Sequence, residues 1–169
     1  MVAIRDAHGD ELDVAAAVMV DAYEQYIPAD AAGPLAGYRE EIRDVRRRLA
    51  DATLIVAEDR GRIAGAVTYY PDARRDRAAP WPAGWACFRL LAVHPDARGR
   101  GIGRLLTEEC IRRARDEGCA AVALHTTELM AVARAMYERM GFTRVPQFDF
   151  EPMPHLHVLA YRLLLSPSS

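Results

Sequence analysis

Apolar positions along the 169-residue chain recur with two spacings. Alternating or continuous apolar segments of strand length indicate β-strands, and apolar positions every three or four residues indicate amphipathic helices. Seven segments have a strand pattern: residues 2–5, 53–57, 63–70, 85–93, 121–126, 142–145 and 157–165. Four have a helix pattern: residues 12–26, 38–49, 103–117 and 129–140. Strands and helices mixed in this order predict an α/β fold in one domain.

Polar residues, glycine and proline lie at the ends of these elements and between them. Asp10 is placed to cap the first helix, and Pro28 to end its run. Gly61 lies between two strands that we expect to form a hairpin. Residues 71–84, "PDARRDRAAPWPAG", form a proline-rich loop that we expect to be the most mobile segment.

Length and composition are those of a globular protein with a substantial core. We expect one domain over residues 1–165, followed by a frayed tail at 166–169. The net charge of −2 predicts no nucleic-acid partner, and no apolar run reaches membrane-spanning length. The first residues lack the pattern of a signal peptide, so we expect a cytoplasmic protein. Self-association into a homodimer is left open.

Cysteine and histidine give no pattern of disulfide or metal binding. The three cysteines, Cys87, Cys110 and Cys119, have no paired spacing and lie in expected core elements, which favours buried thiols in a reducing compartment. His155 and His157 alone are too few for a zinc site, and we expect no metal.

The segment "HPDARGRGIGRLL", residues 94–106, joins an expected strand to an expected helix with three glycines and three arginines. A P-loop requires a lysine, and all 22 basic residues of this chain are arginine. A dinucleotide fingerprint would require glycine where Arg104 stands. The spacing that does match is Arg98-x-x-Gly101-x-Gly103.

Glycines at such a join let the backbone turn tightly and approach a ligand. Consecutive N–H groups then face one concavity, and the first turn of the following helix adds unpaired donors and the positive end of its dipole. Arg98, Arg100 and Arg104 add positive charge at the rim. The pattern favours a pyrophosphate site, and the alternative is a surface turn with solvated arginines.

"LLAVHPDARGRGIGRLL" resembles the acetyl-CoA motif of the GNAT N-acetyltransferase superfamily, and "LHTTELMAVARAMYERMGF" is similar to the family's second landmark. The resemblance implies a mixed, largely antiparallel sheet of about seven strands flanked by about four helices. It also implies that strands 85–93 and 121–126 splay apart to admit acetyl-CoA, whose pantetheine arm pairs with the strand backbone. The implied cofactor-binding residues are Leu91, Ala92, Val93, Arg98, Gly99, Arg100, Gly101, Ile102, Gly103 and Arg104.

Many relatives carry an asparagine after the second of these strands, and this chain contains none. Thr126 or Thr127 takes its place, or these threonines end the strand and cap the next helix. Both readings stay open.

Acetyl transfer to an amine needs a neutral amine, donors for the tetrahedral oxyanion and a proton for the leaving thiolate. A backbone N–H near Val93 is a candidate donor for the oxyanion. Tyr137 occupies the position that serves as general acid in many relatives; the alternative is packing, because Met130 and Tyr137 are seven residues apart on one helix face.

The sequence does not identify the general base. Asp149, Glu151 and Glu128 are candidates, although the sequence favours a solvated loop carboxylate for each, and a water molecule is a further alternative. The resemblance places acceptor specificity in the first helices and central loops. The aromatic residues there are Tyr23, Tyr26, Tyr69, Tyr70, Trp81 and Trp85, of which the first two also suit the core.

The predicted function is transfer of the acetyl group of acetyl-CoA to a primary amine, on a small molecule or a protein N-terminus, by direct attack through a tetrahedral intermediate. Tyr137 is its predicted catalytic residue. The alternative is a noncatalytic acyl-CoA-binding sensor or regulatory module. Turnover with a panel of amines would distinguish the two.

Overall fold

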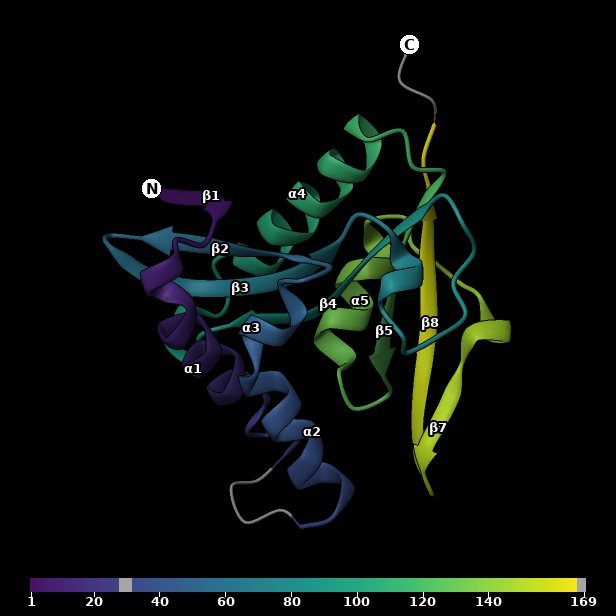
Figure 1. Cartoon of the computed structure of the whole chain (residues 1–169), viewed down its shortest axis with the longest axis horizontal. Coiled ribbons are helices and arrows are strands. Elements are labelled where there is room, and N and C mark those ends of the chain that lie inside the picture. Colours follow the sequence, from purple (N-terminus) through teal and green to yellow (C-terminus); the bar gives the residue numbers. More distant parts are fainter. Residues whose placement is uncertain (28–31, 167–169) are drawn as a thin grey trace. The chain divides into compact units, whose positions relative to one another are not determined.

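The computed structural model describes residues 1–27 and 32–166, which form a mixed α/β fold around an eight-stranded sheet (Figure 1). The strand order is β1-β2-β3-β4-β5-β8-β6, and β7 pairs with β8 outside this path. β4 and β5 run parallel. The pairs β1–β2, β2–β3, β5–β8, β6–β8 and β7–β8 are antiparallel. The predicted mixed, largely antiparallel sheet is confirmed.

The described residues contain eight strands and five α-helices, one more of each than predicted. The strands are β1 (Val2–Asp6), β2 (Thr53–Asp59), β3 (Arg62–Tyr70), β4 (Trp85–Val93), β5 (Ala121–Thr127), β6 (Thr143–Arg144), β7 (Phe150–Met153) and β8 (Leu156–Leu164). The helices are α1 (Leu12–Tyr23), α2 (Pro34–Arg43), α3 (Val45–Arg48), α4 (Ile102–Asp116) and α5 (Ala131–Arg139). Short 3-10 turns lie at Gly9–Glu11, Ala73–Arg75, Pro95–Ala97 and Pro146–Phe148.

The chain forms two compact units. The first contains residues 1–69 and 90–109, and the second contains residues 70–89 and the chain from residue 110 onward. The boundaries fall within β3, β4 and α4, so each of these elements contributes to both units. The predicted domain bounds, 1–165, stay a prediction.

In the first unit, the β2–β3 hairpin turns at Arg60 and Gly61, which have φ angles of 54° and 77°. Two consecutive left-handed residues are what a tight two-residue hairpin requires, and the turn lies where the sequence predicts it. α1 packs beside α2, as Figure 1 shows in purple and blue. Met19, Ile42 and Ile55 are among the fully enclosed side chains of this unit.

In the second unit, β5 pairs with β4 on one side and β8 on the other, and α5 lies against β5. The loop at 71–84 is anchored by three buried side chains. Ala73 is 0% exposed, Asp76 4% and Trp81 3%. The loop predicted to be mobile therefore contributes to the core of this unit.

Several local predictions are wrong for identifiable reasons. The helix predicted at 38–49 is interrupted at Asp44, whose ψ of 67° is not helical and whose carboxylate accepts the N–H of Arg47 at 3.3 Å. Asp10 does not cap α1; instead the Glu11 carboxylate accepts the N–H of His8 at 2.7 Å. Cys119 follows α4 outside any helix or strand and is partly exposed. Pro28 and most of the predicted tail, residues 167–169, lie outside the described residues.

Candidate functional site

β4 is locally distorted next to the segment where the resemblance places the cofactor arm. Its parallel pairing with β5 joins Trp85–Cys87 to Ala121–Ala123, and both strands continue beyond this register. Leu90 has a left-handed φ of 57°, which is rare for a branched residue in a strand and marks a local distortion. The parallel pairing of these two strands thus ends after three residues.

The end of β4 is tightly supported within the first unit. The Tyr23 hydroxyl donates to the carbonyl of Leu91 at 3.3 Å. The His94 N–H donates to the carbonyl of Ala64 on β3 at 2.8 Å. Ala92 is 2% exposed, while Leu91 and Val93 are partly exposed. The backbone predicted to bind a pantetheine arm is therefore held in place by α1 and β3.

The glycine-rich loop between β4 and α4 has the conformation that the sequence predicts. Gly99 and Gly101 have φ angles of 79° and 78°, and a Cβ at either position would meet no atom within 4 Å. These glycines face open space in which a ligand can approach the backbone. Ile102, 1% exposed, anchors the start of α4, whose first-turn N–H groups have no partner within the helix. This geometry suits a phosphate group.

The three arginines of the loop contact other parts of the protein. Arg98 donates to the carbonyl of Ala22 at 3.4 Å, and Arg104 to Glu108 at 2.8 Å. Arg100 is paired with Asp59, a carboxylate that is 7% exposed. The hydrogen bond from Arg100 lowers the pKa of Asp59.

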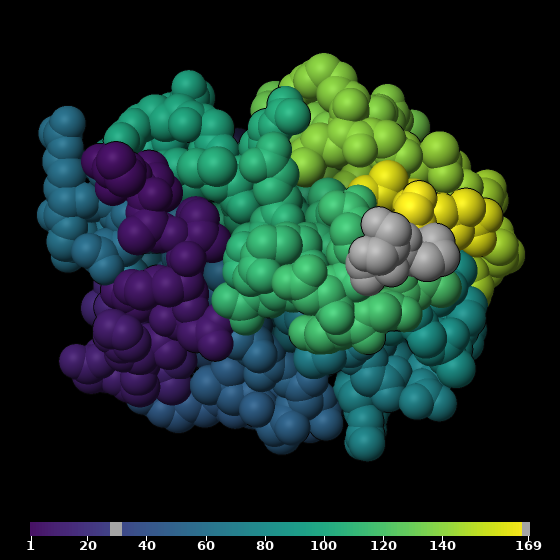
Figure 2. Space-filling model, turned by 90° about the horizontal axis from the view of Figure 1, so that it is seen from above, coloured from purple at the N-terminus to yellow at the C-terminus, as the bar shows by residue number. Residues whose placement is uncertain are grey.

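The outward face of α4 is polar. Arg104 and Arg112 pair with Glu108 and Asp116, each four residues further along the helix. Figure 2 shows this helix, in green, at the surface. The Thr107 hydroxyl, in contrast, is enclosed and donates to the carbonyl of Gly103, one turn earlier in α4, at 2.8 Å.

Tyr137 lies on α5 in the second unit and is 5% exposed. Its ring packs against Phe88 and Phe142, with ring centroids 6.0 and 5.7 Å away. Within residues 1–27 and 32–166, the structure gives its hydroxyl no hydrogen-bond partner. Burial raises the pKa of Tyr137, so the phenol keeps its proton throughout the physiological range.

The two threonines predicted to replace the family asparagine differ in their surroundings. Thr126 is 4% exposed, and its hydroxyl contacts the sulfur of Met130 at 3.7 Å. The Thr127 hydroxyl is buried without a hydrogen-bond partner. Neither caps α5, whose N-terminal cap is Met130, so the capping interpretation is wrong. An unpaired buried hydroxyl favours Thr127 as the replacement.

The carboxylates considered as bases are engaged elsewhere or exposed. Asp149 binds both terminal nitrogens of Arg144 at 2.7 and 2.5 Å and accepts the N–H of Ala160 at 2.7 Å. These bonds, chiefly that from Arg144, lower the pKa of Asp149, which makes it a weak base. Glu151 accepts the N–H of His155 at 3.1 Å, and Glu128 is exposed.

Sequence reasoning missed an aromatic cluster on β5 and its neighbours. The His125 ring lies against Trp81 with centroids 4.6 Å apart, and Trp81 also contacts Trp85 and Phe148. Side chains alternate along β5, so His125 lies on the other face of the strand from Leu124 and Thr126, which are buried. The sequence already indicated this alternation.

The aromatic residues considered for acceptor specificity are largely buried. Tyr26 is the exception, being partly exposed with its ring 6.2 Å from that of Tyr23. The five buried residues are Tyr23, Tyr69, Tyr70, Trp81 and Trp85.

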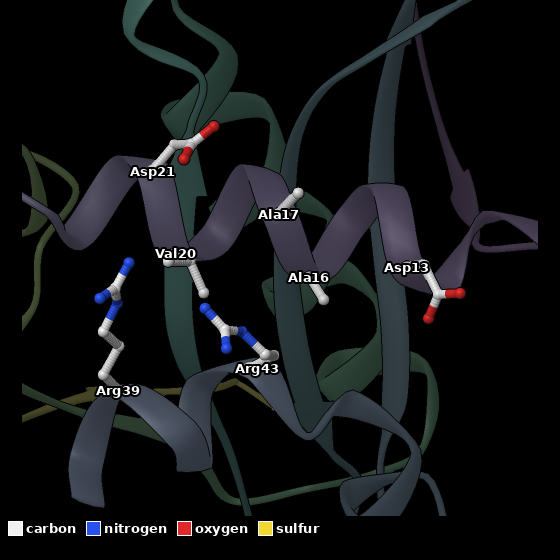
Figure 3. A pocket seen from close by; sticks show the side chains of 7 residues that line it. All are labelled: Asp13, Ala16, Ala17, Val20, Asp21, Arg39 and Arg43. Atoms are coloured by element: carbon white, nitrogen blue, oxygen red, sulfur yellow. The ribbon is translucent and has the colours of Figure 1, made fainter. Parts of the chain in front are cut away.

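A surface groove of about 320 Å³ lies between α1 and α2, where Arg39 and Arg43 extend toward α1 (Figure 3). It shares no residue with the predicted site. Its lining residues are Asp13, Ala16, Ala17, Val20, Asp21, Arg39 and Arg43. Among the described residues, no helix is long and apolar enough to span a membrane, and no three metal-ligating side chains are grouped.

A mixed sheet distorted at β4, together with a glycine loop that opens α4, defines a class of α/β proteins suited to phosphate-bearing ligands. Within that class, the model of the acetyltransferase (GNAT) family matches residues 18–142. The chain belongs to this family. It is 34% identical over 121 residues to a mycothiol acetyltransferase of Thermomonospora curvata, a match that spans 68% of this chain and 38% of that protein.

Solved structures agree on the fold. A ribosomal-protein-alanine N-acetyltransferase of Brucella melitensis superposes with a TM-score of 0.67 at 23% identity, over 96% of this chain and 99% of that one. The PaiA N-acetyltransferase of Thermoplasma acidophilum, solved in complex with coenzyme A, superposes with a TM-score of 0.69 at 13% identity. This superposition covers 95% of this chain and 98% of that one. At these identities the likeness concerns the fold.

Proposed function

We propose that this protein is an N-acetyltransferase that transfers the acetyl group of acetyl-CoA to a primary amine. The observation that carries the proposal is the loop after β4, where Gly99 and Gly101 are left-handed and open to solvent beside the start of α4. Backbone N–H groups of this loop, with the first turn of α4, bind the pyrophosphate. Family membership and a relative solved with coenzyme A support the choice of ligand.

The remaining cofactor contacts in the proposal come from β4. The backbone of Leu91, Ala92 and Val93 pairs with the pantetheine arm, and a backbone N–H near Val93 donates to the oxyanion. The bond from Tyr23 to Leu91 and the rigid packing of Ala92 preorganise this segment, so little ordering is needed on binding. The Thr127 hydroxyl supplies a further polar contact.

Tyr137 acts as the general acid in this mechanism. The amine nitrogen attacks the thioester carbon, the C–S bond breaks, and the thiolate takes the phenolic proton. The raised pKa of Tyr137 keeps this proton in place until the thiolate forms. The absence of a hydrogen-bond partner among the described residues leaves the hydroxyl without a structural bond to compete with that transfer.

The acceptor is a primary amine, either on a small molecule or at a protein N-terminus. The names of a mycothiol acetyltransferase and of a ribosomal-protein-alanine N-acetyltransferase, to which this chain is similar, refer to one acceptor of each kind. Residues 1–165 form the functional domain in this proposal. Its free cysteines fit a reducing compartment such as the cytoplasm, and whether two copies associate is left to measurement.

Replacing Gly101 with valine tests the cofactor site. The substitution forces a branched residue into a left-handed conformation and fills the open space above the loop, so acetyl-CoA binding measured by calorimetry should be abolished. Gly118→Val is the matched control, because Gly118 has nearly the same φ, 76° against 78°, and equally open surroundings at the other end of α4.

Both variants should lose similar stability, at about 1–2 kcal/mol for the left-handed residue, and both should fold. If Gly101→Val binds acetyl-CoA as the parent does, the cofactor site is wrongly placed. If the parent binds acetyl-CoA but acetylates none of a broad panel of amines, the protein is a noncatalytic acyl-CoA-binding module.

A further inference from the structure

The loop between β4 and α4 is joined to β2 by the side chain of Arg100. Residues 98–101 are exposed, and Arg100 stands between Gly99 and Gly101, which have left-handed φ angles of 79° and 78°. A segment with two such glycines has many accessible conformations, so a contact from outside the loop is needed to hold one of them. The Arg100 guanidinium makes that contact, because Nη2 donates to Oδ2 of Asp59 at the end of β2. Both residues belong to the first unit.

The Asp59 carboxylate is enclosed and depends on this hydrogen bond. Its Oδ1 atom is buried and accepts no hydrogen bond from the described residues. The α-amine of Met1 lies 3.8 Å from Oδ1, but Met1 is fully exposed and its charge is screened by solvent. The bond from Arg100 is the chief reason why the pKa of Asp59 is lowered, so the carboxylate stays charged at physiological pH.

This pairing keeps Arg100 on Asp59. An enclosed carboxylate is costly without its partner, so moving Arg100 to a ligand would leave Asp59 in an unfavourable state. The other two arginines restrain the loop less firmly. Arg98 makes a long bond of 3.4 Å to a neutral carbonyl, that of Ala22, and Arg104 bonds to Glu108 within its own helix. A charge-assisted bond such as that of Arg100 is the stronger kind.

We propose that Asp59 is a positioning residue of the acetyl-CoA site, and that through Arg100 it holds the glycine loop in the conformation that binds the pyrophosphate. The proposal rests on the acetyltransferase function given above, because it assumes that acetyl-CoA binds at this loop. Arg100 stays on Asp59 when the cofactor is bound, while backbone N–H groups contact the phosphates. A loop already held in its binding conformation loses little freedom on binding, which raises the affinity.

The charges of the pair distinguish this role from a direct phosphate contact. If Arg100 were itself a ligand of the phosphates, Asp59 would only neutralise it. Removing the carboxylate would then strengthen the binding of the anionic cofactor. If Asp59 positions the loop, its removal weakens binding even though a negative charge is lost. The two roles therefore predict opposite changes in affinity.

Two variants of Asp59 test the proposal. Asparagine has nearly the same size and keeps an oxygen that accepts a hydrogen bond from Arg100, whereas alanine keeps none. We expect the Kd of acetyl-CoA, measured by calorimetry below the melting range, to rise by about tenfold in Asp59→Ala and by less in Asp59→Asn. Arg100→Gln should bind about as weakly as Asp59→Ala. Combining Asp59→Ala with Arg100→Gln should weaken binding no further, because both changes break the same contact.

Glu58→Gln is the matched control. Glu58 precedes Asp59 on β2 and pairs with Arg5 at 2.7 Å, so the substitution removes the same charge at the neighbouring residue without altering a contact of the loop. Its affinity for acetyl-CoA should stay close to that of the parent.

Trypsin provides a measurement that needs no ligand, because it cleaves after arginine and requires a mobile segment. Cleavage after Arg100, followed by mass spectrometry, should be several times faster in Asp59→Ala than in the parent, and Glu58→Gln should be cut at the parental rate.

Equal or tighter binding of acetyl-CoA by both Asp59 variants would overturn the assignment. So would a double variant that binds distinctly more weakly than Arg100→Gln, or an unchanged rate of cleavage after Arg100 in Asp59→Ala. None of these results affects the proposed function, because the parent would still bind and transfer the acetyl group. That function fails on different evidence, namely a parent protein without turnover or a Gly101→Val variant that still binds acetyl-CoA.

Discussion

Gly65 on β3 stands where a side chain has no room. A Cβ built there would lie 2.8 Å from the carbonyl oxygen of Ala92, 3.0 Å from Ile102 and 3.2 Å from Leu106. Ordinary contacts begin at 3.4 Å, so the nearest atom is about 0.6 Å too close and belongs to the backbone of β4. Gly65→Ala therefore requires β4 to shift at Ala92.

Overpacking of this kind costs about 1–3 kcal/mol. For a chain of this size, each kcal/mol lowers the melting temperature by about 2–4 °C, so Gly65→Ala should melt roughly 2–12 °C below the parent. Ala92 is the middle one of the three residues whose backbone is proposed to pair with the pantetheine arm. A displaced β4 should for that reason also weaken acetyl-CoA binding, measured by calorimetry below the melting range.

Gly37→Ala provides the matched control. Gly37 lies inside α2, has no atom within 4 Å of its missing Cβ and needs no left-handed conformation. Alanine there should stabilise the protein by about 0.4–1 kcal/mol and leave acetyl-CoA binding unchanged. Thermal and urea unfolding of the parent, Gly65→Ala and Gly37→Ala measure these differences in stability. Equal stability of Gly65→Ala and the parent would show that the contact between β3 and β4 is looser than the structure indicates.

Two further predictions concern the reaction. Tyr137→Phe should lower kcat by about 10²-fold, which is the low end of general-acid effects because a thiol is a good leaving group. The KM for acetyl-CoA and the melting temperature should stay near parental values. An unimpaired kcat would remove Tyr137 from the mechanism. Incubation with acetyl-CoA should add at most one stable acetyl group, at the α-amine of Met1, because the chain contains no lysine. Mass spectrometry that finds several modified sites would contradict this prediction.

Most of the fold follows from local patterns in the sequence. The β2–β3 hairpin, β4 and β5 were predictable because their residues alternate or are continuously apolar and their ends are marked by glycine or proline. β7 was missed because "FEPM" contains a glutamate and a proline. A proline is tolerated in this strand because β7 pairs only with β8, at the edge of the sheet.

The break between α2 and α3 shows why helix limits were harder to predict. Residues 38–49 keep a helical spacing of Ile42, Val45 and Leu49 across the break. Asp44 nevertheless binds a nearby backbone N–H with its side chain and leaves the helical conformation. The side-chain hydrogen bond and the helical backbone hydrogen bond that compete here differ by about 1 kcal/mol. The spacing of apolar residues carries no information about so small a difference.

The backbone conformation of the loop between β4 and α4 was predictable because its requirement is local. Glycine at 99 and 101 is needed for left-handed backbone angles, and the residues themselves reveal it. The ion pair of Arg100 with Asp59, 41 residues earlier in the chain, could not be predicted in the same way. The same holds for Asp149, which reads as a free loop carboxylate until its bonds to Arg144 and Ala160 are seen.

Burial shifts the pKa values of Tyr137 and His125 in opposite directions, and this follows from the charges of the two groups. A phenol is neutral when protonated, so an apolar environment raises the pKa of Tyr137. An imidazole is neutral when deprotonated, so burial lowers the pKa of His125. At neutral pH Tyr137 therefore holds its proton, and the His125 ring is neutral. For Tyr137, the protonated state is the one that the proposed transfer to the thiolate requires.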